Sequence, residues 1–162
     1  MRRFVPIVFA LATLSVPLAG QGPSAVAHPD FAGTWKLDPK RSEGAGVPIS
    51  MTLKVSKDAK VLSFSRSATT QAGEQGSTMI VNLDGSPTKN TLVTQGVSID
   101  LILKSSWDGP AFVIKTNANI GGQVLDQTDR WTLDPDGKTM HIQTTTAGAN
   151  QTASLKMTLA KQ

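Results

Sequence analysis

Cysteine and tyrosine are absent from this 162-residue sequence, which has only three tryptophans and five phenylalanines. Without a thiol the chain can form no disulfide, no thiolate nucleophile and no cysteine-based metal site. The same absence removes the residue that would carry a lipoprotein-type lipid anchor. Any fold must therefore be held together by side-chain packing and hydrogen bonds alone.

Helical periodicity, long apolar runs and basic clusters are also missing after residue 27. No apolar pattern of helical period persists for three turns, so no long helix is expected. No run there is long and apolar enough to cross a bilayer. Lysine and arginine are scattered singly among acids, which gives no basic stripe for nucleic acid, so nucleic acid is not an expected partner.

The first 27 residues have the pattern of a secretory signal peptide. Arg2 and Arg3 precede an apolar, proline-interrupted run, and Ala25-Val26-Ala27 offers small residues for a signal peptidase. We expect cleavage after Ala27, which leaves 28–162 as one domain of 162 − 27 = 135 residues with a net charge of 16 − 2 − 12 = +2. The mature protein is then expected in the periplasm or outside the cell, with no stable membrane insertion.

The rest of the chain alternates between apolar and polar residues with a period of two. Met51, Leu53 and Val55, for example, fall on one face and Thr52 and Lys54 on the other, which is typical of a strand with one buried side. Asp-Gly pairs at 84–85, 108–109 and 136–137 separate such runs and favour tight hairpin turns. The segment DPKRSEG, with Pro39 first in a helical turn, is expected to form a single turn.

These features predict an all-β fold. The main expectation is an up-and-down antiparallel β-barrel of about 8–10 strands, and an open or flattened sandwich is the alternative. Closure into a barrel would remove the exposed sheet edges of a chain without disulfides.

The alternation also predicts which side chains point inward. They would form either a solid core or the lining of a ligand cavity, and the small number of aromatic residues leaves both interpretations open. The candidates are Trp35, Met51, Leu53, Phe64, Met79, Leu101, Phe112, Trp131, Met140 and Met157.

No catalytic, metal or cofactor site is expected. His141 alternates with Met140 and Ile142, which places its imidazole on the wet face. His28 and His141 have no metal-ligand spacing. Asp126 and Asp129 differ in parity, so a regular strand would send them to opposite faces, which makes them a poor acid–base pair.

Gly33-Thr34-Trp35, on the first strand, resembles the Gly-x-Trp motif of the lipocalin-like, or calycin, family. This resemblance implies that Trp35 closes one end of the barrel, that Gly33 permits close approach, and that a late arginine, here Arg130, packs over the tryptophan. The stretches FAGTWKLDPKRSEG, SSWDGPAFVIKT and DRWTLDPDGKTMHI are more closely similar to small secreted bacterial proteins. That similarity implies an exported barrel and no particular reaction.

The combined expectation is an exported, monomeric, non-enzymatic barrel that binds a small apolar ligand or lipid. The alternative is a solid-core envelope protein without a small-molecule ligand. Its Ser-, Thr- and Lys-rich outer face would contact another envelope protein or a glycan.

Overall fold

The computed structural model describes residues 28–94, 96–148 and 151–162, so the expected signal peptide, 1–27, lies outside the described residues. Strands occupy most of the described chain. In chain order they are β1 (Gly33–Leu37), β2 (Glu43–Gly44), β3 (Ser50–Lys57), β4 (Val61–Thr70), β5 (Gly73–Asn82), β6 (Thr88–Thr94), β7 (Val97–Asp108), β8 (Ala111–Ile120), β9 (Gln123–Leu133), β10 (Thr139–Gly148) and β11 (Gln151–Lys161).

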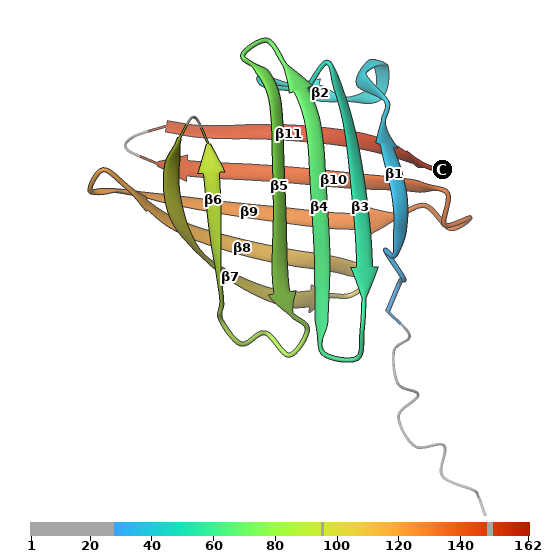
Figure 1. The fold of residues 1–162 in the computed structure, drawn as a ribbon. Helices are drawn as coiled ribbons and strands as arrows, with labels where there is room; N and C mark the ends of the chain where they lie inside the picture. The colour runs from blue at the N-terminus through green and yellow to red at the C-terminus, as the bar shows by residue number, and fades with distance from the viewer. Residues whose placement is uncertain (1–27, 95, 149–150) are drawn as a thin grey trace, which may run out of the picture.

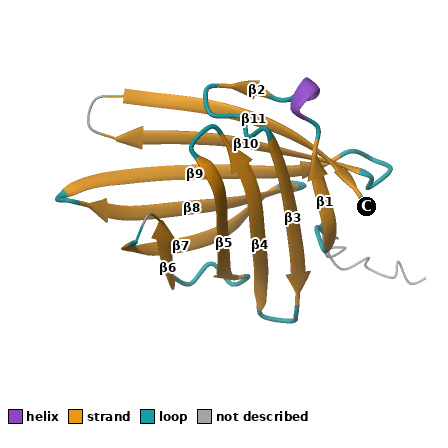
Figure 2. Ribbon diagram, turned by 45° about the horizontal axis from the view of Figure 1, so that its top comes forward, coloured by secondary structure: helices purple, strands orange, loops and turns teal. Residues whose placement is uncertain are grey.

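Ten of these strands form one antiparallel sheet that curls into a nearly closed barrel. Their order is β5-β4-β3-β1-β11-β10-β9-β8-β7-β6, so sequence neighbours pair as hairpins from β3 to β5 and from β6 to β11, and β1 joins these two parts of the sheet. Strands β3 to β6 form one layer, and they run across the strands of the layer behind it (Figure 1, Figure 2). The predicted all-β, calycin-like antiparallel barrel is confirmed.

Alternation along each strand decides which residues are buried. On β10, Met140 and Ile142 are buried between the more exposed Thr139, His141 and Gln143. The hairpins predicted at Asp108-Gly109 and Asp136-Gly137 are present, whereas Asp84-Gly85 turns between β5 and β6, which do not pair with each other. Gly85, Gly109 and Gly137 have φ of 80°, 58° and 67°. Such positive φ values suit glycine, so these Asp-Gly pairs do form the turns expected of them.

A strap, residues 38–49, connects β1 to β3 alongside β11. It begins with the expected helical turn, a 3-10 helix from Pro39 to Arg41, capped by the Asp38 carboxylate. Glu43 and Gly44 then pair with Lys156 and Leu155 of β11. A Cβ on Gly44 would lie 2.6 Å from the Ser154 carbonyl oxygen, so only glycine lets the strap approach β11 this closely.

The sheet has one seam, between β5 and β6, which are not paired as a regular ladder. The Asn90 amide bridges it, because its Oδ1 accepts a hydrogen bond from Ile80 N and its Nδ2 donates to Ile80 O, both at 2.8 Å. Thr88 Oγ1 also accepts from Asn82 N at 3.0 Å. Side chains thus replace a missing strand pairing and satisfy β5 main-chain groups that would otherwise need water.

The hairpin connections divide the barrel into two ends. At the open end, toward the upper left of Figure 1, lie the β4–β5 and β8–β9 connections, together with the end of β6, the start of β7, the end of β10 and the start of β11. At the packed end lie the β3–β4, β5–β6, β7–β8 and β9–β10 turns, together with Phe31 and Trp35.

Candidate functional site

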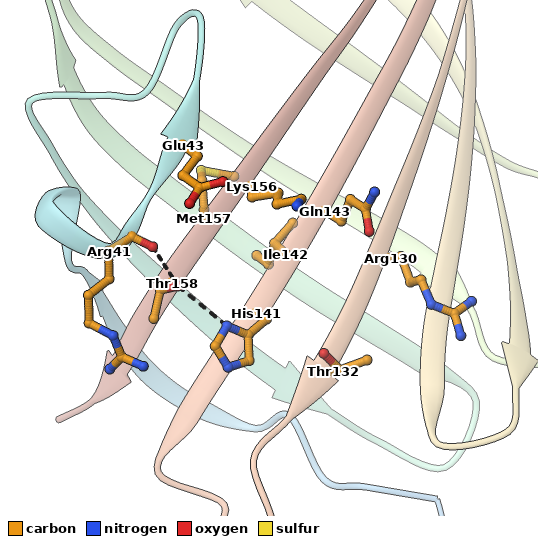
Figure 3. A pocket seen from close by; sticks show the side chains of 10 residues that line it. All are labelled: Arg41, Glu43, Arg130, Thr132, His141, Ile142, Gln143, Lys156, Met157 and Thr158. Atoms are coloured by element: carbon orange, nitrogen blue, oxygen red, sulfur yellow. Dashed lines mark hydrogen bonds between the residues drawn. The ribbon is translucent and has the colours of Figure 1, made fainter.

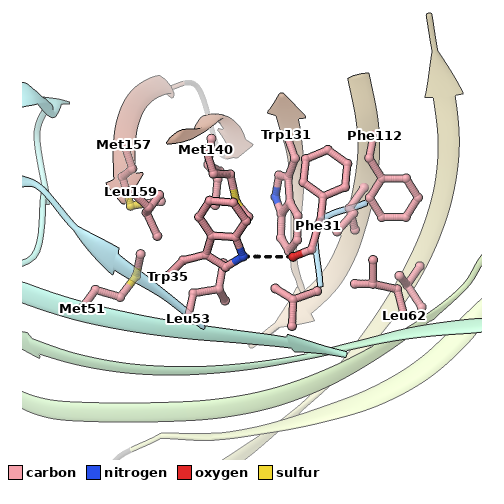
Figure 4. Packing of buried hydrophobic residues seen from close by; sticks show 14 of the residues in the cluster. Phe31, Trp35, Met51, Leu53, Leu62, Phe112, Trp131, Met140, Met157 and Leu159 are labelled. Atoms are coloured by element: carbon pink, nitrogen blue, oxygen red, sulfur yellow. Dashed lines mark hydrogen bonds between the residues drawn. The ribbon is translucent and has the colours of Figure 1, made fainter. Parts of the chain in front are cut away.

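The packed end is filled by aromatic side chains around Trp35. Trp35 is fully buried, and its Nε1 donates to the Phe31 carbonyl oxygen at 2.9 Å (Figure 4). The Phe31 ring meets Trp131 edge-on at 5.9 Å between centroids, and Phe112 lies 6.2 Å from Phe31. These contacts make a solid plug, because aromatic pairs at such spacings bury large areas.

Beyond the plug, a cavity of about 330 Å³ extends toward the open end. A ten-stranded barrel is wider than the eight-stranded barrel that side chains can just fill, so space is left inside. Its apolar wall consists of Ala45, Met51, Leu53, Phe64, Met79, Leu92, Ile99, Leu101, Ala118, Ile120, Leu125, Trp131, Ile142, Ala153, Leu155 and Met157. Its polar wall consists of Arg66, Ser77, Thr116, Gln127, Asp129, Thr144, Thr146 and Ser154.

The structure separates the ten residues expected inside the barrel into two groups. The cavity is lined by Met51, Leu53, Phe64, Met79, Leu101, Trp131 and Met157. The other three, Trp35, Phe112 and Met140, are fully buried at the packed end and do not line the cavity. A binding role for the lining residues stays a prediction.

Arg130 does not pack over Trp35, which corrects one expectation from the resemblance. It points away from the core on β9, where Arg130 Nη1 contacts Asp108 Oδ2 at 2.6 Å. β9 is separated from β1 by β10 and β11, and the inward position on β9 belongs to Trp131. Lys161 takes the place instead, with its Nζ 5.2 Å from the centre of the Trp35 ring.

Gly33 has the close contact that the resemblance implied, and the contact is with Lys161. Its φ is 138°, and a Cβ there would lie 3.0 Å from Lys161 Cε. Gly33 therefore makes room for the lysine that covers Trp35. The cap of this barrel end consists of Gly33, Trp35 and Lys161.

A half-buried carboxylate marks the polar side of the cavity. Asp129 Oδ1 accepts a hydrogen bond from Thr144 Oγ1 at 2.5 Å, and Oδ2 accepts one from Gln127 Nε2 at 2.9 Å. Burial raises the pKa of Asp129 above its usual range, while these hydrogen bonds and the charge of Arg66 oppose that rise. The cavity thus combines an apolar wall with an acid, a cation and neutral hydrogen-bonding groups.

The apolar–polar alternation of the strands did not predict this polar group. Inward positions were predicted to be apolar, although alternation places Gln127 and Asp129 on the same face as Trp131, and Arg66 on the same face as Phe64. The odd spacing of Asp126 and Asp129 along the strand predicted that they lie on opposite faces. The structure confirms this, since Asp126 is exposed on the outer face. A polar residue at a position that alternation assigns to the interior is therefore the feature of the sequence that could have indicated this site.

A second hollow, of about 350 Å³, lies on the outer face beside the strap (Figure 3). It is lined by Arg41, Glu43, Arg130, Thr132, His141, Ile142, Gln143, Lys156, Met157 and Thr158. His141 faces outward as expected, with Nε2 3.0 Å from Asp134 Oδ1 and Nδ1 3.3 Å from Thr158 Oγ1.

This arrangement places an acid, an imidazole and a hydroxyl in the order of a catalytic triad, but the hydroxyl is not positioned as a nucleophile. The buried Thr158 donates its hydroxyl proton to the Arg41 carbonyl oxygen at 2.9 Å, and Thr158 N donates to Ser42 Oγ at 3.0 Å. Both bonds fasten the strap to β11. A nucleophile would instead need an accessible oxygen whose proton passes to the imidazole.

Among the described residues, no group of three or more His, Cys, Asp or Glu side chains could hold a metal ion. None of the helical segments in the part of the chain that the structure describes has the length and apolar character to span a membrane.

The strand order and the hollow interior define a calycin-like β-barrel. Similar solved structures include a secretory abundant heat soluble protein from Ramazzottius varieornatus, with 12% identity and a TM-score of 0.55, covering 86% of this chain and 100% of that one. Secretory abundant heat soluble protein 4 from the same organism has 17% identity and a TM-score of 0.53, with coverages of 81% and 94%. A variant of the fluorescent protein UnaG has 15% identity and a TM-score of 0.52, with coverages of 78% and 94%.

At these identities the likeness concerns the fold alone. No protein family matches the sequence, and the comparison with curated proteins also gives no match. The closer resemblance to small secreted bacterial proteins stays a prediction.

Proposed function

We propose that the barrel binds a small, mainly apolar molecule inside its cavity. The cavity of about 330 Å³ is the observation that carries this proposal. It lies at the small end of the range of about 300–1,000 Å³ that is usual for ligand pockets. Apolar side chains from both layers of the barrel line most of it, which suits a ligand that gains from leaving water.

The polar wall limits what such a ligand can look like. Arg66 and Asp129 both line the cavity, and Thr144 and Gln127 already donate to the two carboxylate oxygens. A ligand without any polar group would leave Arg66 and Asp129 partly desolvated, which costs free energy. An apolar body with one hydrogen-bonding group therefore fits better than a pure hydrocarbon.

The solid-core alternative has less support. A solid barrel needs inward side chains that fill the space, as they do around Trp35 and Phe112. The described structure instead leaves a lined hollow on the open side of Trp131. The outer face and its hollow near His141 could still meet another molecule, and ligand binding inside the barrel does not depend on that face.

Filling the cavity tests the proposal. Thr116 lines it from β8, and its neighbour Lys115 is exposed on the outer face. Thr116→Phe adds an aromatic ring inside the hollow, whereas Lys115→Phe adds the same ring outside. Both variants are titrated with the neutral fluorescent probe N-phenyl-1-naphthylamine, and circular dichroism checks that they fold.

We expect Thr116→Phe to weaken binding by about tenfold or more, because the ring and the probe compete for the same volume. Lys115→Phe is expected to bind like the wild type. Equal affinity in all three folded proteins, or no binding by the wild type to this probe or to a panel of fatty acids and lipids, would count against the cavity as a ligand site.

We further propose that the protein is exported as a monomer after cleavage behind Ala27. Export is supported by the signal-like start of the sequence, where Arg2 and Arg3 precede an apolar run. The chain also has no cysteine that could carry a lipid anchor. The mass of the protein recovered from a periplasmic or culture fraction tests the cleavage, and sedimentation tests the monomer. A recovered mass that includes residues 1–27 would refute the proposed cleavage.

A further inference from the structure

Apolar side chains gather around the mouth of the cavity. The exposed large apolar residues of the described chain are Ile49, Ile80, Val93, Val97, Ile120 and Val124. All of these except Ile80 lie at the open end, and we call those five the collar. Ile49 precedes β3 and hydrogen-bonds Thr69 near the end of β4.

The rest of the collar flanks two hairpin connections. Val93 and Val97 flank the β6–β7 connection, and Ile120 and Val124 flank the β8–β9 connection. Ile120 also lines the cavity, so the collar continues directly into the apolar wall inside. Val93, Val97 and Val124 are 62%, 58% and 53% exposed. Single exposed apolar side chains are common, and the feature of interest here is that five of them lie at the same end of the barrel.

Charge is distributed unequally between the two ends of the barrel. Every turn at the packed end contains or adjoins an aspartate, namely Asp58, Asp84, Asp108, and Asp134 with Asp136. The described residues of the open-end connections, among them Ala72, Gly96, Gly121 and Gly122, are uncharged. The nearest charges along the strands that follow the β4–β5 and β8–β9 connections are both acidic, Glu74 on β5 and Asp126 on β9.

We propose that the collar docks onto a zwitterionic lipid surface, with the cavity mouth facing the acyl chains. An uncharged, apolar rim is complementary to a surface without net charge, and it offers no cations that would favour anionic lipids. Glu74 makes an anionic surface less favourable than a zwitterionic one. This inference goes beyond ligand binding, since docking needs no ligand.

A lipid surface fits the shape of the collar better than a second copy does. The collar side chains project from separate hairpins around an opening, so two rigid copies placed mouth to mouth would meet at scattered points. A fluid surface can close around each side chain individually. Interfacial binding of this kind grows with the apolar area that enters the surface.

Vesicle flotation tests the docking. The variant with Val93→Ser and Val124→Ser removes two collar side chains that do not line the cavity. Ile80→Ser is the matched control, because Ile80 is also exposed on the outer face, at 44%, but lies toward the packed end of β5 beside the seam. The three proteins are mixed with phosphatidylcholine vesicles, and the fraction that floats with lipid is measured at low and high salt.

We expect the wild type and Ile80→Ser to float equally, independently of salt, and the double variant to partition at least about tenfold less. Replacing a third of the lipid with phosphatidylglycerol is expected to reduce flotation. The proposal is overturned if the wild type stays with the aqueous phase, if Ile80→Ser loses as much as the double variant, or if anionic lipid increases binding.

Sedimentation of the same proteins gives the remaining outcome. A concentration-dependent dimer of the wild type that Val93→Ser with Val124→Ser abolishes would assign the collar to a second copy instead of lipid. Flotation and probe binding are read separately, so failure of docking leaves the cavity proposal intact, and failure of the cavity proposal does not alter flotation.

Discussion

Asp129 is a carboxylate in an unusual environment. Its carboxyl lies inside the barrel, where burial raises its pKa. Because the folded pKa is above the unfolded one, its ionisation costs stability. The barrel has its full stability below the unfolded pKa, about 3.9, and loses part of it as the pH rises through the folded pKa.

Replacing Asp129 with asparagine should remove this pH dependence. The oxygen of the introduced amide can still accept from Thr144, and the Gln127 amide can turn to accept from its nitrogen. We expect the melting temperature of Asp129→Asn, relative to the wild type, to rise between pH 4 and pH 7. Thermal unfolding followed by circular dichroism measures it.

Asp126→Asn is the control for the loss of one negative charge, because Asp126 lies on the outer face of the same strand. If the two variants follow the same pH course, or if Asp129→Asn is less stable than the wild type at every pH, the assignment of Asp129 as a costly half-buried acid is wrong.

Single residues also show which contacts can be predicted from the sequence and which cannot. Trp35 is buried as the resemblance implied, because a glycine followed two residues later by a tryptophan suits a barrel floor. The cation over its ring is Lys161, since β11 pairs directly with β1. No pattern in a single sequence states which late strand closes the barrel, so Arg130 was an equally reasonable choice.

At the scale of elements, the Asn90 amide bridges the seam between β5 and β6, alongside the bond from Asn82 N to Thr88 Oγ1. Asn90 gives Ile80 both hydrogen bonds that a neighbouring strand would supply. Asn90→Leu keeps a similar size but loses both, so we expect the free energy of unfolding to fall by about 1–2 kcal/mol. Urea unfolding monitored by tryptophan fluorescence measures this loss.

Thr91→Val is the matched control on the same strand. It loses the exposed bond from Thr91 Oγ1 to Asp100, and a surface change of this kind is expected to stay within about 0.5 kcal/mol. Equal destabilisation by Asn90→Leu and Thr91→Val would mean that the Asn90 bridge does not hold the seam.

Elements were the most predictable level of this protein. Alternation and the Asp-Gly pairs identify the hairpins, because both are local rules. The bridge at Asn90 and the contact of Gly44 with Ser154 connect segments that are distant along the chain or lie on separate strands. Such contacts depend on the closed shape, which local periodicity does not encode.

At the scale of the whole molecule, the barrel is filled at one end and hollow at the other. Alternation correctly predicted inward side chains at both ends, but whether they fill the interior depends on the number of strands and on their volumes together. Phe31, outside the strands and not among the expected inward residues, helps to fill the packed end. The open end carries the uncharged side chains of the collar, whereas the turns at the packed end carry charged residues. A ligand or a lipid surface is therefore expected to approach the barrel from the open end.

The methionines provide the most direct measurement of this division. Met51, Met79 and Met157 line the cavity, whereas Met140 is fully buried at the packed end. The protein labelled with ¹³C at the methionine methyl groups is titrated with N-phenyl-1-naphthylamine, and the methyl resonances are followed by NMR. A ligand in the cavity predicts that the signals of Met51, Met79 and Met157 shift while that of Met140 stays in place. Signals that all remain unchanged at saturating probe, or that shift together with Met140, would contradict a hollow, ligand-binding barrel.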